Sequence, residues 1–380
     1  MREFVAPGRL FTGRPYLRGV PDDSTRRSVL GTLGAAFGAA GAGCLELPFD
    51  AGTDGRSTQF AQRPPLASTA ADGAESIYAQ VYAAAVDSVV FVESGVGQGS
   101  GFVYDSDHVV TNQHVVGGDE AVGIRFSGGR WRTGAVVGRD PYADLAAVRV
   151  DDRPAYARPL SLSDASPSVG QEVVVLGYPL GLDASLSRGV VSEVDRSLRL
   201  QSGFVVPDAI QTDASINPGN SGGPLLTLGA DVAGVITARR GSGVGFGISA
   251  ALTRRVVAAL LRSGQFRHTF LGIRYRELTP RIVAANDLDR TTGLLVVDVV
   301  DGGPAEGVLE PSTTTDDEPP VGGDVIVGLD DEAVHTGDDL SSYLALEASP
   351  GDRLAITVLR DGERRVVELT IAARPPPGDV

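Results

Sequence analysis

The sequence predicts a mainly β protein, with a large all-β barrel or sandwich followed by a smaller α+β domain. From residue 88 to about 250, short Val- and Ile-rich segments alternate with Gly, Pro and Asp, which is typical of many short strands. After residue 270 the composition changes to a few longer strand-like segments with helices between them. The 380 residues, 42% of them hydrophobic, are enough to fill two ordinary cores.

The large domain is expected to begin with a helix, because Ile77, Val81, Tyr82, Ala85 and Val86 recur at helical spacing. A β-branched run from 88 to 93 follows it. The further strands expected here are 99–104, 108–111, 121–126, 145–150, 172–177, 210–212, 232–237 and 245–248. Residues 253–261 predict one amphipathic helix that ends at Gly264.

A domain boundary is expected near residue 266. The smaller domain is expected to hold strands at 293–300, 324–329, 354–360 and 366–372, and a helix at 338–346. Thr279-Pro280 predicts a second helix start, with a cap and a proline in the first turn. Between the strands expected at 293–300 and 324–329, residues 310–320 are expected to form a Pro- and Asp-rich loop.

Residues 1–44 resemble a twin-arginine export signal. Arg26-Arg27 precedes a weakly hydrophobic run that ends at Gly43-Cys44, and this run is too short and Gly-rich for a comfortable membrane span. Cleavage and lipidation of Cys44 would explain why the single Cys lies there; the alternatives are an uncleaved anchor or a cleaved signal with an incidental Cys. Residues 45–75 predict a flexible linker. The expected location is the outer face of the cytoplasmic membrane.

The charge balance excludes some partners. Forty-eight acidic residues stand against 33 basic ones, all Arg, for a net charge of −15. Such a surface repels phosphate backbones and anionic lipid, so nucleic acid is not expected and membrane contact is expected only through the N-terminus. Acidic excess without Lys predicts solubility at high salt, although biased base composition would also replace Lys by Arg. One Cys excludes an intrachain disulfide and a Cys-rich zinc site, and we expect no metal and no cofactor.

The segment Asn217-Pro218-Gly219-Asn220-Ser221-Gly222-Gly223-Pro224-Leu225 carries the strongest chemical signal. Glycines on both sides of a serine let the backbone turn tightly and direct successive N–H groups inward, as an oxyanion hole requires. The alternative is a Gly-rich turn with an ordinary serine.

A serine becomes a nucleophile only when a base accepts its proton and a third group orients that base. His114 ends an apolar strand in Thr111-Asn112-Gln113-His114-Val115-Val116, and Asp144 directly precedes the apolar strand expected at 145–150. A carboxylate buried there needs hydrogen-bonding partners.

The other polar candidates are assigned to structure. Asp140 precedes Pro141 and is interpreted as a turn residue. Asp213 is expected in a buried polar network near the serine loop. His108, His268 and His335 are expected to be solvated surface residues.

The segments TNQHVV, DLAAV and GNSGGPL, in the order His, Asp, Ser, resemble the HtrA/Deg family of trypsin-like serine proteases. The resemblance implies a chymotrypsin/trypsin-like double β-barrel over residues 76–265. It also implies that His114 is general base and then general acid, that Asp144 orients it, and that Ser221 forms the acyl-enzyme. Gly219, Asn220 and Ser221 are then the oxyanion loop.

The resemblance also places Ile216 and Thr237 in the primary specificity pocket. A branched aliphatic side chain there implies a small apolar pocket and cleavage after Val, Ala or Ile. Arg239 and Arg240, in the loop that would lie opposite, depart from this pattern.

Residues 266–374 resemble a PDZ domain, followed by a tail at 375–380. Phe270-Leu271-Gly272-Ile273 is similar to the carboxylate-binding loop of that domain, so Leu271, Gly272 and Ile273 are the expected peptide-binding residues. The partner helix is the one expected at 338–346, and Gly322 to Ile326 resembles the turn into the next strand. Residues 311–320 are an insertion, expected to be a solvated acidic loop.

These observations predict an exported serine endopeptidase that hydrolyses unfolded or damaged polypeptides through an acyl-enzyme, in protein quality control. The alternatives are a chaperone or holdase in which proteolysis is minor or gated, and an esterase with the same acyl chemistry. The PDZ-like domain favours polypeptides or exposed C-termini as partners over small esters. The resemblance further implies a homotrimer, formed through the helix that carries Tyr78 and Tyr82.

Overall fold

The computed structural model describes residues 75–376 except 182, 241–242 and 314–317. The predicted export signal with Cys44, the linker up to residue 74 and residues 377–380 of the tail lie outside the described residues. Among the helices that are described, none has the length and apolarity needed to cross a membrane.

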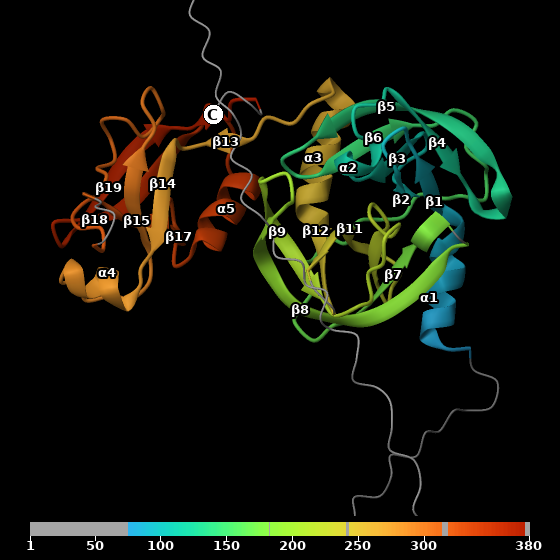
Figure 1. Ribbon diagram of the computed structural model, residues 1–380, viewed down its shortest axis with the longest axis horizontal. Coiled ribbons are helices and arrows are strands. Elements are labelled where there is room, and N and C mark those ends of the chain that lie inside the picture. The colour runs from blue at the N-terminus through green and yellow to red at the C-terminus, as the bar shows by residue number, and fades with distance from the viewer. Residues whose placement is uncertain (1–74, 182, 241–242, 314–317, 377–380) are drawn as a thin grey trace, which may run out of the picture. The chain divides into compact units, whose positions relative to one another are not determined.

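The first barrel follows a short helix, α1 (Ile77–Ala85), and a 3-10 turn, η1 (Val86–Ser88). Six antiparallel strands close in the order β1-β2-β3-β6-β5-β4. Figure 1 shows this barrel in blue-green. Its strands are β1 (Val89–Glu93), β2 (Gln98–Val103), β3 (His108–Thr111), β4 (Ala121–Arg125), β5 (Trp131–Asp140) and β6 (Leu145–Arg149), with α2 (Gln113–Val116) after β3 and η2 (Ser127–Gly129) after β4.

The second barrel, in green to yellow in Figure 1, closes in the order β10-β11-β12-β9-β8-β7. Its strands are β7 (Glu172–Gly177), β8 (Ser185–Arg199), β9 (Val205–Thr212), β10 (Pro224–Thr227), β11 (Val232–Arg240) and β12 (Val244–Ser249), with η3 (Pro179–Gly181) after β7. Helix α3 (Ala250–Ser263) follows and packs back on β5 and β6 of the first barrel. Ser249 caps its first turn, and Gly264 ends it in the left-handed conformation, as predicted.

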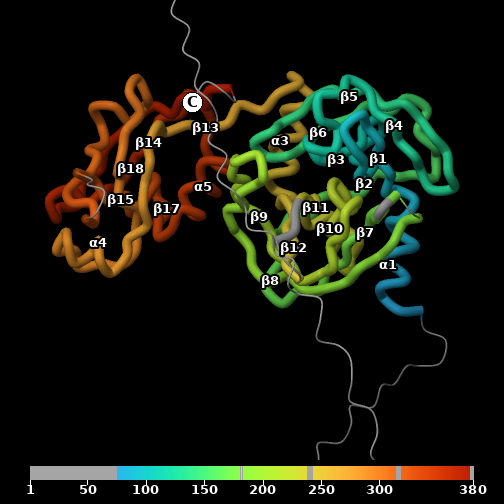
Figure 2. The backbone as a smooth tube through the Cα atoms, in the orientation of Figure 1, coloured from blue at the N-terminus to red at the C-terminus, as the bar shows by residue number. Residues whose placement is uncertain are grey.

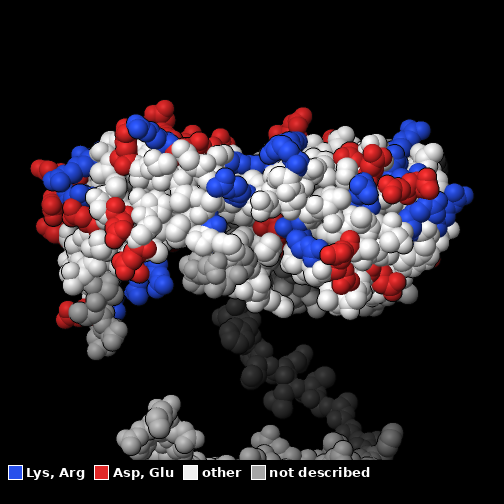
Figure 3. All heavy atoms as spheres, turned by 90° about the horizontal axis from the view of Figure 1, so that it is seen from above, with Lys and Arg blue, Asp and Glu red and all other residues white. Residues whose placement is uncertain are grey.

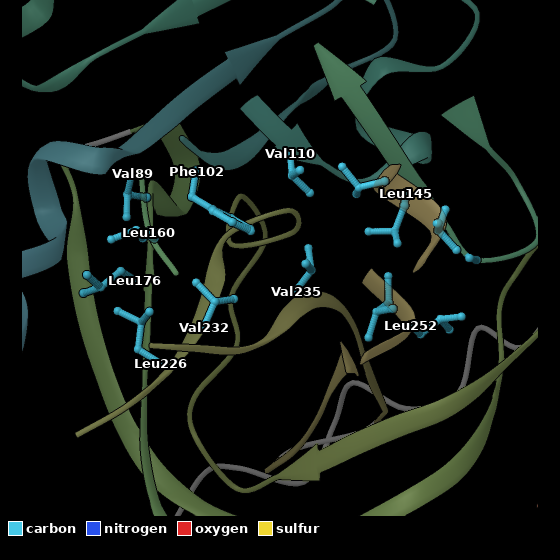
Figure 4. Packing of buried hydrophobic residues seen from close by; sticks show 14 of the residues in the cluster. Val89, Phe102, Val110, Leu145, Leu160, Leu176, Leu226, Val232, Val235 and Leu252 are labelled. Atoms are coloured by element: carbon cyan, nitrogen blue, oxygen red, sulfur yellow. The ribbon is translucent and has the colours of Figure 1, made fainter. Parts of the chain in front are cut away.

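The two barrels share one buried apolar cluster besides the core inside each. Figure 4 shows Phe102, Val110 and Leu145 of the first barrel facing Leu176 and Val235 of the second. Burying these side chains between the barrels stabilises the pair as one body, at about 25 cal/mol per Å² of apolar surface removed from water. The edge of this interface is where the polar residues described below converge.

The fold class predicted from the sequence is confirmed. Three strands of the two barrels were not among the expected ones, namely β5, β8 and β10, and neither were β13, β14 and β17 of the smaller domain. Most positions of β5 and β8 are half-buried or exposed, because the barrel wall leaves one face near solvent. Polar and small residues are therefore interspersed along them, and no apolar run marks the strand. Strand β10 is four residues long and begins at Pro224, and a proline at that position favours the prediction of a loop rather than a strand.

The smaller domain contains a sheet in the order β14-β15-β16-β18-β19, with β17 paired to β16, and a separate pair β13-β20. It is orange to red in Figure 2. Its elements are β13 (Thr269–Phe270), β14 (Ile273–Glu277), α4 (Pro280–Ala285), β15 (Leu294–Val299), β16 (Val325–Leu329), β17 (Glu332–Ala333), α5 (Gly337–Leu346), β18 (Arg353–Arg360), β19 (Glu363–Thr370) and β20 (Ala372–Ala373).

The predicted helix starts of this domain are present. Thr279 accepts a hydrogen bond from the N–H of Ile282, with Pro280 in the first turn of α4. A capping box of Thr336 and Asp339 begins α5. On the face of the molecule seen in Figure 3, acidic groups are interspersed with Arg rather than gathered in one region.

Candidate active site

His114 lies in the single helical turn α2, directly after strand β3 of the first barrel. Its side chain is half exposed, at 49%, while Val115 and Val116 beside it are buried and fix the turn to the barrel. The ring therefore faces an opening while its backbone is held rigidly.

Asp144 lies in the turn between β5 and β6, and only 3% of it is exposed. Its backbone is left-handed, with φ of 54°, which costs a non-glycine residue free energy unless its surroundings hold it. Asn112 supplies one restraint, since its side-chain NH₂ donates to the carbonyl of Asp144 at 2.9 Å. The side chain of Asp140 organises the turn from its other end, as predicted for a turn residue, by accepting from the N–H groups of Tyr142 and Ala143.

The carboxylate of Asp144 is fully partnered. Nδ1 of His114 lies 2.8 Å from Oδ2 and 2.9 Å from Oδ1, and the backbone N–H of His114 donates to Oδ1 at 3.0 Å. The hydroxyl of Thr237, from β11, donates to Oδ2. This set fixes the tautomer of His114 with its proton on Nδ1, so Nε2 is free to accept a proton.

The environment of His114 raises its basicity. Burial by itself lowers the pKa of the imidazole. The hydrogen bond to Asp144 and the negative charge of that carboxylate both raise the pKa, and together they have the larger effect, so the pKa of His114 lies above its ordinary value. The pair is therefore built to stabilise an imidazolium.

Ser221 lies at the turn that precedes β10 of the second barrel. Gly222 beside it has φ of +84°, and a Cβ there would lie 2.1 Å from the carbonyl oxygen of Ser100, so only glycine fits. The hydroxyl of Ser221 donates to the carbonyl of Thr237 at 3.3 Å. Ser221 and His114 line one cleft, although they belong to different barrels.

The loop before Ser221 is anchored to the first barrel. Ser100, fully buried in β2, donates its hydroxyl to the carbonyl of Gly219 at 2.6 Å and its N–H to the carbonyl of Ser221 at 2.7 Å. The N–H of Asn220 donates to Asn217. Within the described part of the chain, the N–H groups of Gly219 and Ser221 have no acceptor. Of the three residues predicted for the oxyanion loop, two therefore offer an unused donor, and Asn220 does not.

The two residues predicted for the specificity pocket, Ile216 and Thr237, make different contacts. Ile216 lines the same cleft, and its Cδ1 would be 2.2 Å from a Cβ at Gly245, so this side chain fills the space beside β12. Thr237 also lines the cleft, but its hydroxyl is turned to Asp144. Residues 241–242 and the side chains of Arg239 and Arg240 lie outside what the structure describes.

Leu271, Gly272 and Ile273 lead into β14, which is the edge strand of its sheet. Gly272 has φ of +72°, and its carbonyl accepts from Val300. Leu271 is buried. An edge strand after a tight glycine turn is the geometry on which an extended peptide pairs.

Two of the expectations for the other polar residues are wrong, and a third, for His108, holds only in part. His268 is not a solvated residue: its side chain is 12% exposed, and its Nε2 lies 2.6 Å from Oδ2 of the buried Asp140. Asp213 is exposed rather than buried, and it accepts from the N–H of Val190 in β8. His335 is exposed as predicted, whereas His108 is partly buried against Asp105.

Sequence reasoning missed Asn112, Thr237 as a partner of Asp144, and Ser100. Asn112 lies two positions before His114 in the same segment, so its role could have been predicted from the sequence. Thr237 and Ser100 are ordinary residues of β strands, and only the closing of the barrels brings them to the site. Among the residues that the structure describes, no three His, Cys, Asp or Glu gather as ligands for a metal ion.

Two closed six-stranded barrels, with a His–Asp pair from the first and a Gly-flanked serine from the second on one cleft, are the arrangement of a trypsin-like peptidase domain. The trypsin-like peptidase domain family matches residues 99–235, and the PDZ domain family matches residues 269–371. The chain belongs to the HtrA family of trypsin-like serine proteases with a C-terminal PDZ domain.

Among similar proteins is a probable periplasmic serine endoprotease, DegP-like, of Chlamydia trachomatis serovar D. It is 33% identical over 286 residues, which is 73% of this chain and 54% of the relative. Protease Do-like 1, chloroplastic, of Arabidopsis thaliana is 35% identical over 288 residues, with 73% and 64% covered. The chain thus spans little more than half the length of the first of these relatives.

Solved structures with the same fold include the HtrA-type protease AlgW with a tripeptide. That chain is 29% identical, with a TM-score of 0.66, and the match covers 80% of this chain and 99% of that one. The serine endoprotease from Yersinia pestis is 25% identical, with a TM-score of 0.57, and covers 80% and 100%.

Proposed function

We propose that this chain is a serine endopeptidase that hydrolyses peptide bonds in unfolded or damaged polypeptides through an acyl-enzyme on Ser221. One observation carries the proposal: His114 and Ser221, from different barrels, line one cleft, with Asp144 buried behind the imidazole. Membership of the HtrA family and the match to a trypsin-like peptidase domain support it.

The proposed reaction uses these groups in turn. The Ser221 hydroxyl leaves the carbonyl of Thr237, which a rotation about its Cα–Cβ bond allows, and transfers its proton to Nε2 of His114 as Oγ attacks the substrate carbonyl. The imidazolium then donates that proton to the leaving amine, and the C–N bond breaks. Water repeats the sequence on the acyl ester and frees Ser221.

The free N–H groups of Gly219 and Ser221 are proposed to stabilise the negative oxygen that develops in both steps. Ser100 supports this role, because its hydroxyl holds the carbonyl of Gly219 toward the first barrel. Donors fixed before the reaction do not need to reorganise during it, and one such donor accounts for about 10²–10³ in kcat in serine proteases.

The deciding experiment compares the wild-type chain with Ser221→Ala on unfolded casein, with aggregation suppression measured beside degradation. The proposal expects degradation by the wild type alone. If both chains suppress aggregation equally and neither degrades casein, the result contradicts the protease hypothesis and supports the holdase hypothesis. If the wild type hydrolyses small activated esters but leaves casein intact, the esterase reading replaces it.

For specificity, we propose a small apolar primary pocket and cleavage after Val, Ala or Ile. Ile216 supports this, because its branched aliphatic side chain lines the cleft and fills the space beside Gly245. A peptide library read by mass spectrometry tests it. Ile216→Ala is expected to shift cleavage toward Leu and Phe, while cleavage mainly after Arg or Phe by the wild type contradicts the assignment.

We further propose that β14 and the Leu271–Ile273 turn bind exposed C-termini. We also propose that the protein is exported through its twin-arginine segment and anchored to the membrane by a lipid on Cys44. Finally, we propose that it forms a trimer. The peptide-bound AlgW structures and the periplasmic descriptions of relatives support peptide binding and export. In α1, the hydroxyls of Tyr78 and Tyr82 donate to Glu172 and Ala184 of the same chain, and Arg188 lies over the Tyr78 ring at 5.1 Å. A trimer formed through this helix would therefore use the ring surfaces that these contacts leave open. Light scattering tests the trimer, and fatty-acid labelling of a Cys44→Ser variant tests the anchor.

The acidic composition supports a further proposal, that the chain is adapted to high salt. Melting and casein degradation in molar salt and in dilute buffer test it. Equal stability and activity in both would remove this reading.

A further inference from the structure

The segments that enter and leave the PDZ domain form a short two-stranded stem. Thr269 and Phe270 of β13 pair with Ala373 and Ala372 of β20. The N–H of Arg374 donates to the carbonyl of His268 at 2.8 Å and extends the pairing by one more step. The two ends of the PDZ domain therefore leave the stem side by side, at His268 and Arg374.

This end of the stem contacts the turn that carries Asp144. Tyr142, in that turn, donates its hydroxyl to the carbonyl of Pro375 at 2.8 Å, and the guanidinium of Arg374 lies 4.4 Å from its ring centre. The ring of His268 packs edge-on against Tyr142 at 5.1 Å. Residues that adjoin both strands of the stem thus contact one four-residue turn.

Asp140 is the polar centre of this contact. One carboxylate oxygen accepts from the N–H of Tyr142 at 2.9 Å and of Ala143 at 3.4 Å, which shapes the turn. The other oxygen lies 2.6 Å from Nε2 of His268. Because a carboxylate only accepts, Nε2 of His268 donates to it. Asp140 is 3% exposed, so water cannot replace that donor without a rearrangement.

We propose that His268 is a positioning residue for the reaction: through Asp140 it holds the 140–144 turn, and hence Asp144, in the geometry that His114 needs. The inference rests on the proposed peptidase function, and it makes the stem of the PDZ domain a support of the catalytic carboxylate. His268 itself touches neither Ser221 nor the cleft.

The physical reason is the burial of Asp140. Without the donor, one oxygen of a buried carboxylate is unpaired, and the group turns toward water. It then releases the N–H groups of Tyr142 and Ala143. Asp144, in a left-handed conformation that its surroundings must hold, shifts with the turn. A displacement of about 1 Å at a catalytic group is enough to cost about a hundredfold in rate.

The test uses the full-length chain with three substitutions. His268→Phe keeps an aromatic ring and removes the donor, whereas His268→Gln places an amide N–H where Nε2 was. The matched control is His108→Phe, which removes another His–Asp contact of the first barrel, between His108 and Asp105, away from the turn.

Two measurements are made on each variant. The first is the rate of labelling by a fluorophosphonate, in which the Ser221 oxygen bonds to phosphorus, fluoride leaves and His114 accepts the serine proton. The second is kcat and KM for a peptide substrate. Thermal melting accompanies both.

We expect His268→Phe to lower the labelling rate and kcat by about tenfold or more and to leave KM unchanged. His268→Gln should restore most of the rate. His108→Phe should change neither the labelling rate nor kcat. A folded His268→Phe that labels at the wild-type rate overturns it, and so does equal impairment of the Gln and Phe variants, which would make the effect one of packing. If His268→Phe does not fold, His268→Asn, whose amide is too short to reach Asp140, takes its place. A wild-type chain that is not labelled at all refutes the proposed function instead.

Discussion

The hydroxyl of Thr237 donates to Oδ2 of Asp144, so a strand of the second barrel holds the carboxylate that the first barrel presents to His114. The two residues are 93 positions apart in the chain. Because the carboxylate is buried, each donor on it helps to hold its orientation.

Thr237→Val tests this contact, since it keeps the shape and removes the hydroxyl. We expect a loss of about 1–3 kcal/mol in the free energy of unfolding, and a fall of about tenfold in kcat/KM, because one oxygen of Asp144 loses a partner. Urea unfolding and peptide hydrolysis measure the two effects.

The control is Thr253→Val. Thr253 is fully buried in α3, and its hydroxyl oxygen has no hydrogen-bond partner among the described residues. This change should leave stability equal or improved. If Thr237→Val behaves in the same way, the bond to Asp144 has no energetic role.

Asp144→Asn is expected to change the pH profile as well as the rate. The reaction needs neutral His114, so activity falls as the pH drops through the raised pKa of His114, above the ordinary value of 6.5. Without the carboxylate only burial remains, which lowers that pKa, and the acid limb of kcat/KM moves to lower pH. The maximal rate should fall by about 10⁴-fold. An acid limb that stays in place would show that Asp144 does not set the basicity of His114.

Asp208, buried in β9, should make stability depend on pH. Burial and the nearby Asp195 raise its pKa to about 7, from 3.8 in an exposed chain, despite a hydrogen bond from Ser249. The folded state therefore keeps a proton that the unfolded state releases, and stability falls as the pH rises from about 4 to 7.

Asp208→Asn removes this dependence. At pH 8 the variant should be more stable than the wild type by on the order of 3 kcal/mol, and near pH 4 the two should be similar. Urea unfolding at both pH values measures it. The exposed Asp213→Asn is the control, expected to shift neither curve; an Asp208 variant less stable at pH 8 would contradict the reading.

Gly222→Ala should abolish the reaction centre. Its Cβ would lie 2.1 Å from the carbonyl oxygen of Ser100 and 2.4 Å from the hydroxyl of Thr111, and φ is +84°. We expect a loss of more than about 4 kcal/mol in unfolding free energy and no fluorophosphonate labelling.

Gly170→Ala separates the two causes, because Gly170 has a similar φ of +86° but open space around its Cβ position. It should cost only the backbone strain, about 1–2 kcal/mol, and keep full labelling. Equal losses in the two variants would mean that the contact with Ser100 is unimportant.

The sequence was sufficient for the residues that carry their own local signature. His114, Asp144 and Ser221 each adjoin an apolar strand or a glycine turn, so they could be located from short segments. The alternation of short apolar runs and turn residues predicted an all-β barrel or sandwich, and the resemblance to the HtrA/Deg family implied that it is a double barrel.

The rest depends on contacts between distant segments. His268 was expected in solvent because its neighbours are polar, but its partner, Asp140, is 128 positions away. Thr237 and Ser100 look like any β-strand residues until the barrels close. Strands β5 and β8 were missed because their half-buried faces carry polar residues that interrupt the apolar pattern.

Ser100 has a consequence for how this molecule could be divided. Its backbone N–H and hydroxyl, in one barrel, hold the loop of the nucleophile in the other. A chain cut in the connection between β6 and β7 would give two fragments, each with a whole barrel and neither with a working centre. Such fragments, fused to two partner proteins, should report the partners' meeting by the return of hydrolysis, since reassembly is what restores the loop.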